Sequence, residues 1–210
     1  VLYGYDLWIN GKRAGSWRSA YNTALFDITD CLDKKHDSQQ LAMRVITQFP
    51  GSDFDTNDDW APCGIFRDVT LMAVPNIHLS DLTITPRNTG EVNISTKIAN
   101  ADKHTAISHE ILDAQGKVVG ISHVEQPHLW TAETPYLYTL RTTLTRKGKP
   151  LQTFEHKFGF RELTVDGKIL KLNGQPIKLR GVTCHSTDPK TVKVISNELT
   201  LKDMKLMKET

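Results

Sequence analysis

Short apolar stretches separated by turn-forming residues recur along most of the chain, and this pattern predicts a mainly β protein. In the first third, the expected strands are residues 6–9, 14–17, 24–28, 41–46 and 65–74. Asn10-Gly11 lies between the first two, and this dipeptide is the strongest short signal for a hairpin turn. Pro75 ends the last and longest strand. These strands predict half of a β-sandwich.

A second series of short alternating strands begins after residue 76, at near-regular spacing. The expected strands are residues 79–85, 92–99, 107–112, 118–123, 137–145 and 151–158. Turn-forming residues separate them, at Asn88-Thr89-Gly90, Gln115-Gly116 and Lys147-Gly148. Strands of this number and length predict an immunoglobulin-like β-sandwich of about 100 residues, which we place at residues 76–160.

The pattern changes again in the last fifty residues. Residues 168–172 and 176–181 flank Asn173-Gly174 and predict another tight hairpin. A polar loop that carries His185 follows, and Ser196 is a suitable N-cap for a helix.

The final element is predicted to be a helix, because Leu201, Met204 and Met207 recur at helical spacing. A strand, a polar loop and a helix in this order are typical of the start of a (β/α)8 barrel. The helical pattern reaches Thr210 without a Gly or Pro to end it, and Val1 is not an initiator residue. We therefore expect the chain to be truncated at both ends.

Composition narrows the class of protein. Lys+Arg 26 against Asp+Glu 24 gives a net charge of +2, and no block of like charge indicates a nucleic-acid partner. No apolar run approaches the roughly 20 residues of a membrane span, so no membrane partner is expected. Cys31, Cys63 and Cys184 fit neither a disulfide framework nor a zinc site, which favours reduced or incidental thiols. The compartment stays open between the cytoplasm and the periplasm of a bacterium.

One loop concentrates candidate chemistry ahead of the strand at residues 65–74. Asp58 and Asp59 stand beside Trp60, and carboxylates with an indole form a combination that binds sugar hydroxyls and sugar faces. Gly64 permits close approach of the backbone. The alternative is a solvated acidic loop that is capped by its own carboxylate in an Asx-turn.

Seven landmarks along the chain occur in an order that resembles glycoside hydrolase family 2, and within it the β-galactosidases most. They are residues 6–12 (DLWINGK), 21–29 (YNTALFDIT), 58–69 (DDWAPCGIFRDV), 129–138 (LWTAETPYLY), 159–162 (GFRE), 172–176 (LNGQP), and Arg180-Gly181-Val182 with His185. The resemblance covers practically the whole chain, and its strength lies in the order of the landmarks.

The resemblance implies a particular domain order. Residues 1–75 are expected to be the C-terminal part of a jelly-roll domain related to sugar-binding modules, and residues 76–160 an immunoglobulin-like sandwich. Residues 161–210 would then begin a TIM-barrel catalytic domain that is truncated after its first strand and helix. Members of the family hydrolyse β-glycosides with retention, using two glutamates about 5 Å apart on later barrel strands. Neither glutamate is therefore expected in this chain, which alone should be inactive.

The resemblance also implies roles for two residues. Asp58 aligns with an acidic residue that helps to hold the sugar and is a candidate sodium ligand, with Asp59 as the fallback. His185 aligns with a histidine that hydrogen-bonds the sugar, although Thr183-Cys184 stands where the family usually has Asn-Arg. The intact enzyme would need no organic cofactor, with Na⁺ and Mg²⁺ as candidate ions. It would act on a β-galactoside or a related saccharide, and a homo-oligomer is compatible with it.

Two further expectations follow. Without the rest of a barrel, apolar side chains of residues 168–210 lack a cover, so this segment should be poorly ordered or packed against another molecule. The apolar side chains expected to lack a cover are Leu170, Leu172, Ile177, Leu179, Val182, Leu201 and Met204. The alternative function, from a different class, is a noncatalytic carbohydrate-binding or adhesive β-sandwich protein.

Overall fold

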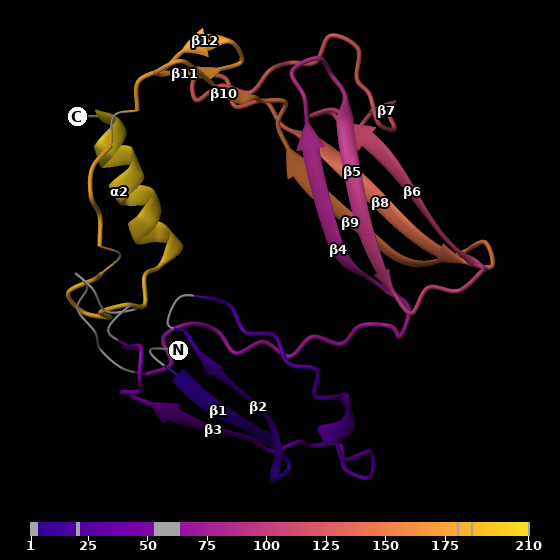
Figure 1. Ribbon diagram of the computed structural model, residues 1–210, viewed down its shortest axis with the longest axis vertical. Helices are drawn as coiled ribbons and strands as arrows, with labels where there is room; N and C mark the ends of the chain where they lie inside the picture. Colours follow the sequence, from indigo (N-terminus) through magenta and orange to yellow (C-terminus); the bar gives the residue numbers. More distant parts are fainter. Residues whose placement is uncertain (1–3, 20–21, 53–63, 180, 186, 210) are drawn as a thin grey trace. The chain divides into compact units, whose positions relative to one another are not determined.

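The computed structural model describes residues 4–19, 22–52, 64–179, 181–185 and 187–209. The chain divides into two compact units, residues 1–71 with 182–210, and residues 72–181 (Figure 1). Strands make up most of the regular structure in the described residues, which confirms the predicted mainly β fold class. Among the described residues, no helix has the length and apolar character needed to cross a membrane.

The first unit is built on a three-stranded antiparallel sheet in the order β2-β1-β3. Its strands are β1 (Gly4–Ile9), β2 (Lys12–Arg18) and β3 (Leu41–Ile46). The turn between β1 and β2 has positive φ angles at Asn10 (51°) and Gly11 (77°), as a tight hairpin requires. The hairpin predicted from Asn10-Gly11 is confirmed.

Apolar residues on alternate positions of β1 form a small core on one face of this sheet. Tyr5, Leu7 and Ile9 are buried there, and the ring of Phe26 meets that of Tyr5 edge-on at 6.1 Å. A Cβ on Gly15 would lie 2.5 Å from the Phe26 ring, so this close approach requires glycine. Residues 24–28 thus cover the sheet face and lead into the 3-10 turn η1 (Thr29–Cys31); the strand predicted there is wrong.

The strand predicted at residues 65–74 is also wrong, since this segment is irregular in the structure. Most of its apolar side chains are exposed, including Leu71 at 77 % and Met72 at 64 %, although Phe66 is half-buried. A strand forms only where a neighbouring backbone supplies the ladder of hydrogen bonds, and no described strand pairs with this segment.

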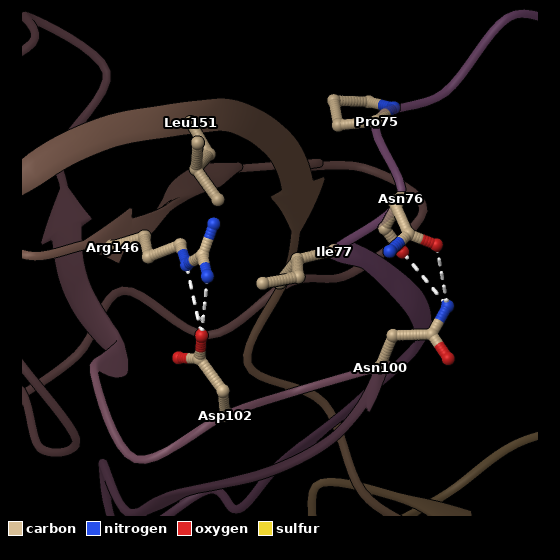
Figure 2. Close-up of a pocket in the computed structure, with 7 residues that line it drawn as sticks. All are labelled: Pro75, Asn76, Ile77, Asn100, Asp102, Arg146 and Leu151. Atoms are coloured by element: carbon tan, nitrogen blue, oxygen red, sulfur yellow. Dashed lines mark hydrogen bonds and ion pairs between the residues drawn. The ribbon is translucent and has the colours of Figure 1, made fainter.

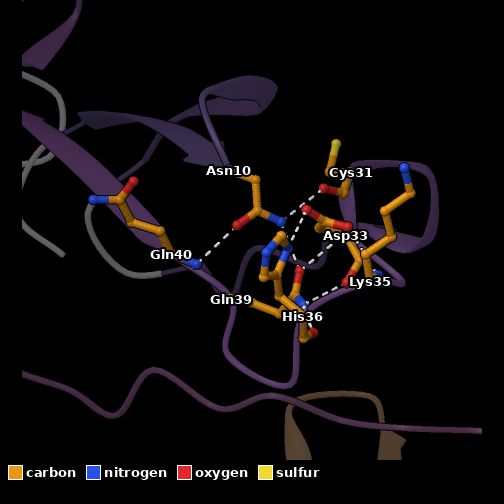
Figure 3. Close-up of polar contacts among 7 residues, drawn as sticks. All are labelled: Asn10, Cys31, Asp33, Lys35, His36, Gln39 and Gln40. Carbon is orange, nitrogen blue, oxygen red and sulfur yellow. Dashed lines mark hydrogen bonds and ion pairs between the residues drawn. The ribbon is translucent and has the colours of Figure 1, made fainter.

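A polar network joins the β1–β2 turn to the segment before β3 (Figure 3). The Asn10 side-chain amide donates to the carbonyl of Cys31 at 3.1 Å and to the Gln39 side chain at 2.6 Å. Its side-chain oxygen accepts from the backbone N–H of Gln40 at 2.9 Å. Asn10 therefore serves both the turn and the connection that follows it.

The second unit is a sandwich of two antiparallel sheets (Figure 1). One sheet pairs β4 (His78–Pro86) with β5 (Val92–Ala99). The other has the order β7-β6-β8-β9, formed by β6 (Thr105–Leu112), β7 (Val118–Gly120), β8 (Tyr138–Arg146) and β9 (Lys149–Phe158). The predicted strands are all present, although β7 has only three residues.

Aromatic residues dominate the core of this sandwich. Tyr138 lies with its ring centroid 5.0 Å from that of Phe160 and 6.0 Å from that of Phe158. Ile111 and Leu140 complete the centre and are fully buried with Phe160. Such rings remove large apolar areas from water, which makes this cluster the main source of stability in the unit.

A small sheet follows the sandwich, formed by β10 (Leu163–Asp166), β11 (Ile169–Leu172) and β12 (Gln175–Pro176). The predicted turn at Asn173-Gly174 is confirmed by φ angles of 51° and 81°. β10 was not predicted from the sequence.

The last element is the helix α2 (Asn197–Glu209), which confirms the predicted helix. The hydroxyl of Ser196 accepts from the N–H of Leu199 at 3.1 Å, as an N-cap does. Of the seven apolar side chains expected to lack a cover in residues 168–210, four are exposed and three are half-buried. The exposed ones are Leu179, Val182, Leu201 and Met204, and the half-buried ones are Leu170, Leu172 and Ile177. The degree of order of this segment stays a prediction.

Replacing Leu140 by Ala should lower the free energy of unfolding of the second unit by about 2–5 kcal/mol, because a fully buried side chain is lost and a cavity remains. The matched control is Val118→Ala, since the Val118 side chain is 47 % exposed and should cost much less. Urea unfolding followed by circular dichroism measures both. Equal losses in the two variants would contradict this placement of the core.

Candidate functional site

The two residues that the sequence singled out for sugar contact are not placed together by the structure. Asp58, with Asp59 and Trp60, lies outside the described residues. His185 is described, and its side chain is exposed. The pairing of Asp58 with His185 therefore stays a prediction.

The loop that carries His185 leads into a tight turn. The carbonyl of His185 accepts from the hydroxyl of Thr187 at 3.2 Å. Asp188 and Val192 exchange two backbone hydrogen bonds of 2.8 Å, and the Asp188 carboxylate accepts from the N–H of Lys190 at 2.7 Å and of Thr191 at 2.8 Å. These donors lower the pKa of Asp188, so the carboxylate that holds the turn stays ionised.

Backbone strain is present at the end of this turn. Val192 has a φ of 58°, which is unusual for a β-branched residue. Such a conformation persists only where surrounding contacts hold it, and the two backbone bonds between Val192 and Asp188 supply them. The connection from His185 to α2 is therefore defined by its own local hydrogen bonds.

Glu198, on the helix α2, does not suit general acid chemistry. The backbone N–H of Glu198 itself and the Ser196 hydroxyl lower the pKa of Glu198, which lies in the first turn. A general acid near neutral pH needs a raised pKa instead. Glu209 lies on the last turn of the same helix and is exposed.

A cavity of about 290 Å³ lies at one end of the sandwich (Figure 2). It is lined by Pro75, Asn76, Ile77, Asn100, Asp102, Arg146 and Leu151. The Asp102 carboxylate accepts from the Thr105 hydroxyl at 2.9 Å, the His104 N–H at 3.0 Å and the Arg146 guanidinium at 2.7 Å. Hydrogen bonds from Thr105 and His104 lead in lowering the pKa of Asp102 to about 2. These groups already satisfy one another, so the cavity is a structural feature of the sandwich end.

A second cavity, of about 610 Å³, lies at the loops that follow β6 and β7. It is lined by Asp113, Gln115, Val119, His123, Val124, Glu125, Gln126, His128, Tyr136 and Tyr138. The ring centroids of His128 and Tyr136 are 4.7 Å apart. The Tyr138 hydroxyl accepts from the His128 N–H at 3.0 Å, and that of Tyr136 accepts from the Ala114 N–H at 3.2 Å. Both phenols thus have structural partners.

Asp6 is a buried charge that pattern analysis of the sequence did not single out. Its side chain is 3 % exposed and contacts the guanidinium groups of Arg13 at 3.4 Å, Arg18 at 2.9 Å and Arg44 at 2.5 Å. Hydrogen bonds from Arg18 and Arg44 lower the pKa of Asp6 to about 2. The one signal for this buried charge in the sequence was an acidic residue between the apolar residues Tyr5 and Leu7. Its arginine partners could not be identified in the same way, because they come from β2 and β3. The cluster organises the polar face of the first sheet.

The part of the chain that the structure describes contains no cluster of metal-binding side chains. No group of three or more His, Cys, Asp or Glu side chains there could hold a metal ion. The described cysteines, Cys31 and Cys184, are both free thiols. The sodium site predicted at Asp58 stays a prediction.

The described chain is a mainly β protein in which a β-sandwich is followed by a small sheet and a helix, and comparison with known families identifies its class. Residues 1–75 match the sugar binding domain of glycosyl hydrolases family 2. Residues 77–161 match the family model described simply as glycosyl hydrolases family 2, and residues 163–210 match the TIM barrel domain of the same family. The chain belongs to glycosyl hydrolases family 2. The resemblance inferred from the seven landmarks is confirmed.

Similar proteins share this assignment. The chain is 31 % identical to a β-galactosidase of Halalkalibacterium halodurans and 30 % identical to one of Yersinia pestis, over all of its own length. It spans only 22 % and 23 % of those proteins. Among solved structures, a β-glucuronidase of Bacteroides uniformis is 27 % identical, with a TM-score of 0.83 over 99 % of this chain and 29 % of that one. A β-glucuronidase of Parabacteroides merdae, at 21 % identity and a TM-score of 0.83 over 99 % of this chain and 30 % of that one, supports the fold alone.

The Asp6 cluster should make the stability of the first unit sensitive to acid. Because the folded-state pKa of Asp6 is lowered from 3.8 to about 2, its contribution is present above pH 4 and is lost as the pH falls toward 2. We expect Asp6→Asn to be less stable than the wild type at pH 6, with a difference that narrows toward pH 2.

Urea unfolding between pH 2 and pH 6 measures this dependence. Asp37→Asn is the control, since Asp37 is an exposed carboxylate of the same unit, and it should leave the profile unchanged. Parallel profiles for wild type and Asp6→Asn would show that Asp6 does not link stability to pH.

Proposed function

We propose that this chain is a portion of a retaining β-glycosidase that hydrolyses O-glycosidic bonds, with a β-galactoside as its substrate. The observation that carries the proposal is the ordered match of three domain models of one hydrolase family along the whole chain. Matches over the whole of this chain to parts of two proteins named β-galactosidase support galactose as the sugar. We also propose the division into residues 1–75, 76–160 and 161–210.

Both catalytic glutamates are proposed to lie outside these residues. Retention requires two carboxyl groups about 5 Å apart, one as acid/base and one as nucleophile. In a (β/α)8 barrel such groups stand at the C-terminal ends of strands. Glu198 and Glu209 lie instead on the exposed helix α2, which supports an origin of the catalytic pair elsewhere in a longer protein.

The chain would contribute contacts to the sugar. A carboxylate at Asp58 can accept hydrogen bonds from sugar hydroxyls and coordinate a sodium ion, since both interactions use its oxygens. The exposed imidazole of His185 can donate to a hydroxyl of the same sugar. Mg²⁺ binding and assembly of the intact protein into a homo-oligomer belong to the same proposal.

The proposal also specifies the sugar, a galactoside rather than a glucuronide. Relatives by sequence are named β-galactosidases, whereas the solved structure at 27 % identity is a β-glucuronidase. A glucuronide carries a carboxylate that a galactoside lacks, and a site built for one rejects the other through unpaired polar groups. Turnover of aryl β-galactosides and aryl β-glucuronides by the longer protein separates the two.

Changing Asp58 to Asn in the longer protein should lower kcat/KM on an aryl β-galactoside by about 10–100-fold, because a charge-assisted hydrogen bond to the sugar is lost. Activation by sodium should weaken in the same variant. Asp59→Asn is the matched control and should keep most of the activity. Unchanged turnover and sodium response in Asp58→Asn would remove Asp58 from the site and favour Asp59.

The isolated 210-residue chain should not hydrolyse aryl β-galactosides and should bind galactose or lactose only weakly, since both catalytic glutamates and most of the barrel are proposed to lie outside it. Isothermal titration with these sugars and an overnight hydrolysis assay measure this. Tight binding without hydrolysis would support the alternative, a noncatalytic carbohydrate-binding or adhesive protein.

A further inference from the structure

The two sheets of the sandwich differ in width. β4 lies against β9, and its Leu79 N–H donates to the Gln152 side chain at 3.2 Å. β8, the neighbour of β9, has Leu140, Thr142 and Leu144 fully buried. The next strand, β6, places Ile107 opposite Leu144 and His109 opposite Thr142, yet both are only partly buried. The two-stranded sheet therefore leaves Ile107 and His109 incompletely covered, whereas Ile111 on the same face of β6 is fully buried.

The edge of β5 is open above this part of the β6 face. The Val92 N–H donates to the carbonyl of Ser122 at 2.8 Å, and Glu91 forms an isolated bridge with His123. Beyond this point the chain leaves the edge, because residues 118–120 pair with β6 instead.

Backbone groups of alternate residues point to the same side of a strand. Since the Val92 N–H points to the open side, the N–H and C=O groups of Ile94, Thr96 and Ile98 point there too. In the part of the chain that the structure describes, no strand pairs with them. Such a row of groups is a template for another strand.

We propose that the open edge of β5 binds a single extended peptide, antiparallel to β5, which adds a third strand to this sheet and covers Ile107 and His109. Every second side chain of the peptide would be apolar and face the sandwich interior. On the outer face, a carboxylate would suit the peptide, because Lys97 is exposed there beside Asn93 and Ser95 and has only a long, exposed ion pair with Asp81 at 3.9 Å.

A second copy of this sandwich does not fit the same edge. β6 lies beyond the edge of β5 in the facing sheet (Figure 1), and β7 is the outer neighbour of β6, which leaves room for an added strand. If two β5 strands paired about a two-fold axis, each four-stranded sheet would be brought into the space that the other occupies. The occupant is therefore a peptide strand, bound mainly by backbone hydrogen bonds.

The test uses the 210-residue chain and a fluorescein-labelled heptapeptide that alternates valine with threonine and carries one central glutamate. Fluorescence anisotropy should show saturable binding. Thr96→Pro should weaken it at least tenfold, since proline removes an N–H on the open edge without removing a bond to β4. No binding at millimolar chain concentration, or wild-type affinity in Thr96→Pro, would overturn the proposal.

A pair of charge variants keeps the test independent of the fold of Thr96→Pro. Ser95→Lys should tighten binding of the glutamate peptide about 2–5-fold, and Ser95→Glu should weaken it by a similar factor. Thr153→Lys adds the same charge on the outer face of the other sheet and should change nothing. Equal shifts in all three variants would overturn the proposal. Concentration-dependent self-association that Thr96→Pro abolishes would do so too, and would point to a second copy.

Discussion

A β-strand exists only where another backbone pairs with it, and this constraint decides which apolar segments of the chain become strands. Residues 41–46 become β3 because they lie beside β1 along its full length. Residues 65–74 have as strong a strand pattern, but they are irregular because no described strand lies beside them. β7 is limited to three residues for the same reason, since it pairs with β6 only at Ile111 and Leu112. Hydrophobic alternation thus identifies segments that could form strands, and backbone pairing with a neighbouring strand decides which of them do.

Much of the fold could be predicted because the decisive signals are local. The turns at residues 10–11, 147–148 and 173–174 need positive φ angles, which Gly and Asn tolerate, so the positions of the hairpins follow from Asn-Gly at two of them and from Gly148 at the third. Ser196 likewise marks the start of α2. The role of residues 24–28 could not be predicted this way. An apolar run can either pair as a strand at a sheet edge or pack over a sheet face. The close contact between Phe26 and Gly15 shows that residues 24–28 pack over the face.

The candidate site was much less predictable than the fold, because its geometry depends on residues far apart in sequence. Asp6 shows the difficulty within the described chain. Its three arginine partners come from β2 and β3, and neither composition nor spacing indicates that they meet at one carboxylate. Asp58 stands beside Asp59 and Trp60, a combination that suits sugar binding, but its specific role and that of His185 were inferred from the order of the family landmarks. Family membership is shown across the chain, whereas the roles of these two residues rest on position within it.

The junction after the sandwich shows how one domain can fix the position of the segment that follows it. Asn173, in the β11–β12 turn, accepts from the Glu162 N–H at 2.9 Å through its side-chain oxygen and donates to the Trp130 carbonyl at 3.1 Å. The Glu162 carboxylate also contacts Arg87 at 3.0 Å, and the Arg161 guanidinium lies 4.8 Å from the ring centroid of Trp130. The small sheet is thereby fixed to the sandwich through polar groups and one aromatic ring. In the proposed enzyme this rigidity matters, because hydrogen bonds to a sugar lose most of their strength with displacements of about 1 Å. The sandwich would then act on catalysis through the position of the barrel strands that follow it, without touching the substrate.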